Sequence, residues 1–452
     1  MKKNSSKVKP TIPLTTINPD AAGIDIGSKE IYVCVPADRD AQFVRTFETF
    51  TVDLHALAKW LESCHIKTIA IESTGIYWVP LMEILEQYGF EVYLVNAKNL
   101  KNVSAKKSDV LDCQWLQQMH SYGLLRCSFR PEEEICVLRA LVRHKDTLLQ
   151  YRASHIQHMQ KALHQMNLQL DNVISDITGV TGMHIMRAIV SGNHNPDELA
   201  QFRDPACKSS KEVIRKSLVG NYRKEHLFAL KQSLELYDFY TELIQQCDVE
   251  IKEHYRELEK AEWKEKPMPE GRKLKRQQNA PDYDLRTLLY RTCGVDLTAI
   301  PGISVITAQA LLSEIGDDLA AFPTSRHFCS WLALSPNNKI TGGKILDRRI
   351  KKASNRATLS LRLSARSLQH SNSALGAYYR KMRAIHGPAK AIIATAHRLA
   401  RIIYSMLTRR VEYDETIQQN HDARYKEHVL KNLKKRARDY GMELVPVSTM
   451  VS

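Results

Sequence analysis

The sequence predicts an α/β domain at the N-terminus, followed by long helices and then a mostly helical C-terminal region. Three observations support this order. Short apolar runs alternate with helically spaced ones early in the 452-residue chain, two long apolar stripes follow, and the C-terminal part is basic with helical spacing. A chain of this length with 43% hydrophobic residues can hold two or three domains, each with its own core.

Turn and spacing signals define the N-terminal elements. Two short apolar runs, at 24–26 and 31–35, flank Gly27-Ser28-Lys29 and predict a β-hairpin. We then expect a helix, a short buried strand, a helix that ends at a glycine and another strand, in TVDLHALAKWLESC, KTIAIESTG, IYWVPLMEILEQYG and FEVYLVN. A further helix follows in KKSDVLDCQWL. Together these segments predict a βαβ-rich domain of about 125 residues.

Four carboxylates stand at unusual positions in this domain. Asp25 lies inside the first apolar strand, where a buried acid is costly unless it is paired or holds a metal. Glu72 ends the strand TIAIE, at the edge where open α/β sheets place their ligands. Asp109 and Asp112 are three residues apart, so on a helix they share one face and repel each other. The set could bind two divalent ions, Mg²⁺ above all, and activate a water or hydroxyl at a phosphate.

A simpler reading of Asp109 and Asp112 stays open. Ser108 is a good helix cap, and acids in the first turn complement the positive end of the helix dipole.

Charge and cysteine usage narrow the class of protein. The chain has 65 Lys and Arg against 50 Asp and Glu, a net charge of +15 that favours a polyanionic partner such as nucleic acid. Its nine cysteines include no C-x-x-C pair, so we expect neither a zinc knuckle nor a disulfide framework. No apolar run follows the basic N-terminus and none approaches the length of a membrane span, which predicts a cytosolic protein with no membrane partner.

The middle of the chain predicts two long helices. Apolar residues recur at alternating spacings of three and four, interrupted by Arg152. After a break around SGNHNPDEL, a second apolar stripe follows. An intrachain helical hairpin is the default reading, and pairing between protomers is the alternative. The stripes consist of Leu149, Ile156, Met159, Leu163, Met166 and Leu170, and of Leu230, Leu234, Tyr237, Ile244, Ile251 and Leu258.

Three C-terminal segments suggest contact with phosphates. The linker 264–284 is rich in charge and proline, and LTAIPGISVITAQALLSEIGD resembles a helix-hairpin-helix with a turn at Pro301-Gly302. Residues 339–366 include nine basic side chains and one acid. This excess of positive charge suits phosphate positioning, although a solvated basic helix has the same composition. The expected nucleic-acid-binding residues are Lys339, Lys344, Arg348, Arg349, Lys351, Lys352 and Arg356.

The order of Asp25, then ESTGIYW with Glu72, then the D-x-x-D pair of KKSDVLDCQWL resembles the DEDD transposases of bacterial insertion sequences. The resemblance covers roughly residues 20–445. It implies an RNase H-like, RuvC-type N-terminal domain with Mg²⁺ at the four acids, a coiled-coil middle, and a C-terminal domain whose serine attacks DNA. It further implies a homo-oligomer, dimer or tetramer, an element-encoded guide RNA, and the cytoplasm of a prokaryote.

The sequence departs from the family at the nucleophile. In LSPNNKITGGK, Thr341 stands where the resemblance implies the serine. Serine and threonine hydroxyls can both form covalent intermediates when activated, but the extra methyl group of threonine narrows the approach of its hydroxyl to the DNA phosphate. Ser335 and Ser354 are nearby substitutes, and neither precedes a glycine.

The resulting hypothesis is a transposase that cleaves and rejoins DNA through Thr341. A metal-dependent nuclease without a covalent intermediate and a non-catalytic nucleic-acid binder remain as alternatives. A nucleotide-binding fold of the actin and sugar-kinase type is a distant alternative, because it needs a second D-x-G phosphate loop on a hairpin. The other D-x-G of the sequence, at 439–441, follows a basic run instead of an apolar strand. The expected segments are a basic N-terminus (1–20), a RuvC-like DEDD domain (21–130), a helical or coiled-coil region (131–263), a linker (264–284) and a C-terminal transposase domain (285–445).

Overall fold

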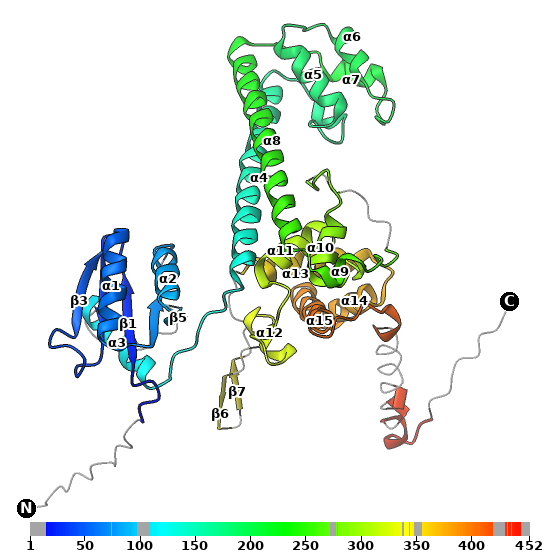
Figure 1. Cartoon of the computed structure of the whole chain (residues 1–452). Coiled ribbons are helices and arrows are strands. Elements are labelled where there is room, and N and C mark those ends of the chain that lie inside the picture. The colour runs from blue at the N-terminus through cyan, green and yellow to red at the C-terminus, as the bar shows by residue number, and fades with distance from the viewer. Residues whose placement is uncertain are drawn as a thin grey trace, which may run out of the picture. The chain divides into compact units, whose positions relative to one another are not determined.

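The computed structural model divides into two compact units, Met1–Arg130 and Pro131–Ser452 (Figure 1). Only the backbone is described at 339–340 and 344–347. The described residues are 15–73, 75–96, 109–271, 277, 279–336, 339–342, 344–347, 355–418, 430–431, 433–434 and 436–443. The division into five segments expected from the sequence stays a prediction.

The first unit is built on a five-stranded mixed sheet in the order β3-β2-β1-β4-β5. β1 and β2 form the predicted antiparallel hairpin, β3 pairs antiparallel with β2, and β4 and β5 run parallel to β1. The strands are β1 (Ala21–Ile26), β2 (Glu30–Cys34), β3 (Val44–Glu48), β4 (Thr68–Glu72) and β5 (Glu91–Val95). The helices are α1 (Thr51–Ser63), α2 (Trp78–Gln87) and α3 (Asp109–Ser121). The mixed α/β prediction is confirmed, whereas β3 was not predicted.

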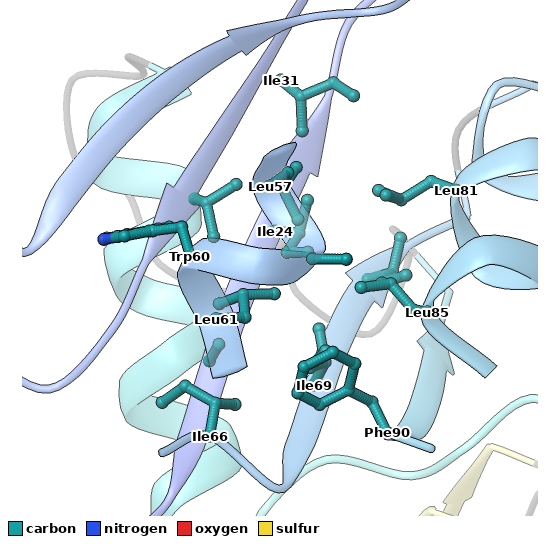
Figure 2. Close-up of a cluster of buried hydrophobic side chains, with 14 of the residues drawn as sticks. Ile24, Ile31, Leu57, Trp60, Leu61, Ile66, Ile69, Leu81, Leu85 and Phe90 are labelled. Atoms are coloured by element: carbon teal, nitrogen blue, oxygen red, sulfur yellow. The ribbon is translucent and has the colours of Figure 1, made fainter. Parts of the chain in front are cut away.

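One face of this sheet packs against α1 and α2 (Figure 2). Ile24 of β1 and Ile69 of β4 meet Leu57 and Leu61 of α1, and α2 adds Leu85, all fully buried. Side chains alternate between the two faces of a strand, so the residues next to Ile24 on β1 and next to Ile69 on β4 point to the opposite face. That opposite face is where α3 packs, and it carries the candidate site.

The second unit begins with two long helices, α4 (Glu133–Gln165) and α8 (Lys224–Leu258). They are antiparallel, because the start of α4 bonds to the end of α8: the Glu134 carbonyl lies 2.7 Å from His254 Nε2. Further along, the buried Lys145 pairs with Asp248. The two helices therefore pair within the chain, as in the default reading (Figure 1). Pairing between protomers as a coiled coil stays a prediction.

The polar interruption at Arg152 has a structural explanation. Its guanidinium lies 5.6 Å from the ring centroid of Tyr237 on α8, and its Nη2 donates to Asn279 Oδ1 at 2.9 Å. Arg152 thus contributes a cation–π contact to the α4–α8 pair where an apolar residue was expected.

A helical cap joins the far ends of α4 and α8 (Figure 1). It has its own core, in which Met159 and Leu163 of α4 meet Ile185, Ile214 and Leu230. The sequence analysis recognised only a break here. The cap contains η2 (Leu170–Asn172), α5 (Val180–Val190), α6 (Pro196–Leu199), η3 (Ala200–Phe202) and α7 (Lys211–Ser217).

The C-terminal part of this unit is a helical bundle with a small hairpin. It is tied to α4 by the buried Glu314, whose carboxylate accepts two bonds from Arg143 at 2.8 and 2.7 Å. Its helices are α9 (Ala261–Lys264), α10 (Leu285–Cys293), η4 (Leu297–Ala299), α11 (Val305–Ile315), α12 (Ser325–Trp331), α13 (Arg356–Ser367), η5 (Leu368–His370), α14 (Ala374–His386) and α15 (Pro388–Arg409). The hairpin strands are β6 (Lys339–Thr341) and β7 (Lys344–Asp347). Among the described residues, no helix is long and apolar enough to span a membrane.

Candidate active site

Strand register brings Asp25 and Glu72 together. β1 and β4 are parallel neighbours, and Ile24 is opposite Ile71. Continuing that register by one residue places Asp25 beside Glu72. Ile24 and Ile71 face the core, so both carboxylates point to the other face, which α3 covers.

Contacts at the two ends of α3 fix its direction across the sheet. At its C-terminal end, the Ser121 carbonyl accepts from the Ile17 amide at 2.8 Å, just before β1. The buried His120 lies with Nε2 2.8 Å from the Thr68 hydroxyl at the start of β4. The helix therefore runs opposite to β1 and β4. Its first turn, which carries Asp109 and Asp112, lies toward the ends of the strands where Asp25 and Glu72 are found.

The close approach of α3 to the sheet depends on Gly23. A Cβ atom at this position would stand 2.2 Å from the Gln117 backbone nitrogen and 2.4 Å from the Cys113 carbonyl oxygen. No other residue fits without moving the helix. The sequence analysis missed this residue, although a glycine within the apolar run AAGIDIG is a signal of close backbone approach.

Electrostatics tie the four acids into one group. The pKa of the half-buried Asp25 is raised to about 6, first by burial and then by the charges of Glu72, Asp109 and Asp112, in that order. An acid surrounded in this way is protonated more readily than an exposed one. At neutral pH its ionised form therefore destabilises the metal-free fold.

The donor set suits a divalent cation, because all four side chains are carboxylates and Mg²⁺ prefers oxygen ligands. A cation would remove the repulsion that raises the pKa of Asp25. Within the described residues, however, no three His, Cys, Asp or Glu side chains are already close enough together to hold an ion. The acids are gathered at one end of the sheet without being in ligating geometry.

The simpler reading of the α3 acids also fits. The helix begins at Asp109, so both Asp109 and Asp112 lie in its first turn and complement its dipole. Ser108, the expected cap, lies outside the described residues. The helix-start reading accounts for Asp109 and Asp112 but not for Asp25, a half-buried acid on a neighbouring strand.

Two family models match the chain. Residues 22–168, which contain all four acids, match the DEDD model of the IS110 type, described as a transposase. Residues 296–380, which contain Thr341, match the model described as the transposase IS116/IS110/IS902 family. This chain belongs to the IS110 family of transposases. The predicted resemblance is thereby confirmed.

A relative supports the assignment. The insertion element IS110 uncharacterized 43.6 kDa protein of Streptomyces coelicolor is 32% identical to this chain over 114 residues. The chain spans only 28% of the length of that relative, and the alignment covers 25% of the chain itself. The alignment shows that the two proteins are related over these 114 residues.

The candidate nucleophile lies in the second unit. Thr341 ends β6, pairs with Lys344 of β7, and is exposed. Gly342 follows with φ +56°, and a Cβ there would meet nothing within 4 Å. The hydroxyl therefore stands at an open hairpin tip. Ser335 is half-buried, and Ser354 lies outside the described residues.

Of the seven expected nucleic-acid-binding residues, only Arg356 is described with its side chain. Its Nη1 lies 2.7 Å from Asp146 Oδ2 on α4, an ion pair that fixes the start of α13. Nucleic-acid contact by Arg356 stays a prediction, and so does contact by the other six. For Lys339 and Lys344 only the backbone is described, and Arg348, Arg349, Lys351 and Lys352 lie outside the described residues.

The expected phosphate-binding turn is packed against its own unit. A Cβ on Gly302 would lie 3.0 Å from the Ser364 carbonyl of α13, and the Ile303 amide donates to the Ile300 carbonyl. Phosphate binding at this turn stays a prediction.

Proposed function

We propose that this IS110-family protein is a DNA recombinase that moves an insertion sequence by cleaving and rejoining DNA strands. The observation that carries the proposal is the position of Asp25, half-buried on β1 and electrostatically coupled to Glu72, Asp109 and Asp112. The order of its sheet, with three antiparallel strands followed by two parallel ones, supports an RNase H-like domain.

The four acids are proposed to hold Mg²⁺. The bound ion supplies a positive charge that stabilises the phosphate and the leaving oxygen. The chain contributes the placement: β1 and β4 fix Asp25 and Glu72 on one face, and α3 brings Asp109 and Asp112 to that face. Gly23 keeps α3 close enough for the four to act together.

Thr341 is proposed as the nucleophile. Its Oγ1 forms a bond to phosphorus while the bond to the departing strand breaks, and the hydroxyl proton ends on the oxygen of that strand. The resulting ester retains the bond energy needed for rejoining. The family resemblance further implies a guide RNA that selects the DNA sites, and a homo-oligomer in which the acids of one protomer meet the hydroxyl of another. These DNA and RNA partners are expected in the bacterial cytoplasm.

A denaturing gel tests this proposal. The purified chain is incubated with RNA transcribed from the flanking element, Mg²⁺ and element-end DNA. We expect a protein–DNA adduct with the wild type that is lost in Thr341→Ala and in Asp112→Ala. Cleavage without an adduct, sensitive only to Asp112→Ala, would favour the metal-dependent nuclease. Salt-sensitive binding with neither product would leave a non-catalytic binder.

A further inference from the structure

A basic groove lies on the C-terminal helices, and none of its described lining residues belongs to the hairpin that carries Thr341. It is a cavity of about 640 Å³ lined by residues of α12, α14 and α15 and by Gln418. Its lining residues are Ser325, Tyr378, Lys381, Met382, His397, Arg398, Arg401, Ile402, Tyr404, Ser405, Arg409 and Gln418. The apolar face of α15 dominates its sequence pattern, so the pattern alone does not indicate this groove.

The groove is strongly positive. Lys381, Arg398, Arg401 and Arg409 line it, and no described residue that lines it carries a carboxylate. Arg401 and Arg409 form no ion pair with any described residue, so their charges are not neutralised within this part of the chain. A concave surface with one sign of charge concentrates anions.

Aromatic rings stand among these charges in fixed orientations. The Arg398 guanidinium lies 4.5 Å from the ring centroid of Tyr378, and its Nε donates to Gln418 Oε1 at 3.0 Å. The Tyr404 hydroxyl donates to the Phe322 carbonyl at 2.8 Å, and the Tyr404 ring centroid lies 5.9 Å from that of Phe328 on α12. Burial and the charge of Arg401 both lower the pKa of His397, which leaves its imidazole neutral at pH 7.

We propose that this groove binds unpaired nucleotides of a polynucleotide chain, with its arginines on phosphates and Tyr378 beneath a base. Proteins that hold single strands combine a basic groove with aromatic platforms, because every base has a face that can stack. Duplex DNA fits less well, since its bases are enclosed and only its phosphates would reach the rim. The volume lies within the usual range for sites that enclose a small ligand, roughly 300–1,000 Å³. The proposal rests on the proposed function, which supplies the nucleic acid.

Fluorescence anisotropy of the full chain in EDTA tests this groove. The probes are labelled single-stranded RNA, single-stranded DNA and a duplex of the same sequence, each titrated at several salt concentrations. The groove variants are the double variant Arg398→Gln/Arg401→Gln and, separately, Tyr378→Leu with Tyr378→Phe as its conservative partner. The control is Arg383→Gln/Lys390→Gln, which removes the same charge from exposed positions outside the groove.

We expect the double variant to bind a single strand at least about tenfold more weakly. The slope of the logarithm of its binding constant against the logarithm of salt concentration should fall in magnitude by roughly one. Tyr378→Leu should weaken single-strand binding with little change in duplex binding, and Tyr378→Phe should retain it. Whether RNA or DNA binding is lost assigns the source of the strand. Unchanged binding in the groove variants, or an equal loss in the charge control, would overturn the proposal.

This test is independent of strand cleavage. EDTA removes divalent ions, and neither the four acids nor Thr341 is altered. Failure of the adduct experiment would therefore leave the binding result unchanged, and failure of groove binding would leave the adduct intact.

Discussion

Gly23 on β1 lies directly against Gln117 on α3, so close that a Cβ atom would stand 2.2 Å from the Gln117 backbone nitrogen. Gly23→Ala must therefore shift α3 away from the sheet and move Asp109 and Asp112 with it. We expect a loss of about 1–3 kcal/mol in the free energy of unfolding, measured by urea denaturation. The control is Ser28→Ala in the exposed loop of the same hairpin. Equal stability of both variants and the wild type would contradict the close packing of α3.

The raised pKa of Asp25 makes stability depend on pH. The native state holds a proton on this carboxyl up to about pH 6, whereas the unfolded chain releases it near 3.8. The metal-free protein is therefore predicted to lose stability as pH rises from about 4 to about 6, and to stay at the lower value above that. Asp25→Asn should remove this part of the pH dependence and raise stability at pH 7 by about 1–2 kcal/mol, after allowance for partial exposure.

Thermal unfolding in EDTA between pH 4 and 8 measures this effect. Glu48→Gln, at an exposed position of the edge strand β3, is the control. A wild type whose stability follows the same pH course as Asp25→Asn would show that Asp25 is not perturbed.

The buried Lys145–Asp248 pair is predicted to fix the register of α4 against α8. Lys145→Met leaves Asp248 in a site where burial already raises its pKa, so we expect a loss of about 3–5 kcal/mol. The double variant Lys145→Met/Asp248→Leu should recover most of that loss, because neither charge is then buried. Breaking the exposed Arg256–Glu253 pair should cost under about 1 kcal/mol. A double variant as unstable as the single one would contradict this account.

Thr341→Ser is predicted to retain or increase adduct formation. Thr341 is exposed at the end of β6, so losing its methyl group should leave folding unchanged and widen the approach to phosphorus. The measurement is the initial rate of adduct formation on a denaturing gel, with the melting temperature as a check on folding. Loss of the adduct in Thr341→Ser would mean that this hydroxyl is not the attacking group.

The sequence predicted the elements that carry strong periodicity or clear turn signals. The β1–β2 hairpin, α1, β4, α2, β5 and the long pair α4 and α8 all follow from such patterns. β3 escaped because VRTFE is a half-exposed edge strand without a continuous apolar face. The cap around α5 to α7 escaped because its short helices depend on a shared core, which no single segment reveals.

Prediction of the site was similarly uneven. Asp25 was recognisable because an acid inside an apolar strand violates the strand pattern, and Glu72 because it ends one. The packing of Gly23 on Gln117 is a contact between distant segments, so its consequence for α3 required the structure. The basic groove combines residues of α12, α14 and α15 with Gln418, and the pattern of α15 alone indicates only a buried face.

Metal binding by the full chain tests the central claim most directly. Mn²⁺ is titrated into the protein at pH 7 and the free ion is followed by electron paramagnetic resonance, with Mg²⁺ as competitor. The variants are Asp25→Asn and, as a control, Asp38→Asn at an exposed position of the same unit. We expect the wild type to bind Mn²⁺ and Mg²⁺ to displace it. Asp25→Asn should weaken this binding at least about tenfold, and the control should retain it. Equal binding by the wild type and Asp25→Asn would contradict a metal site built from these four acids.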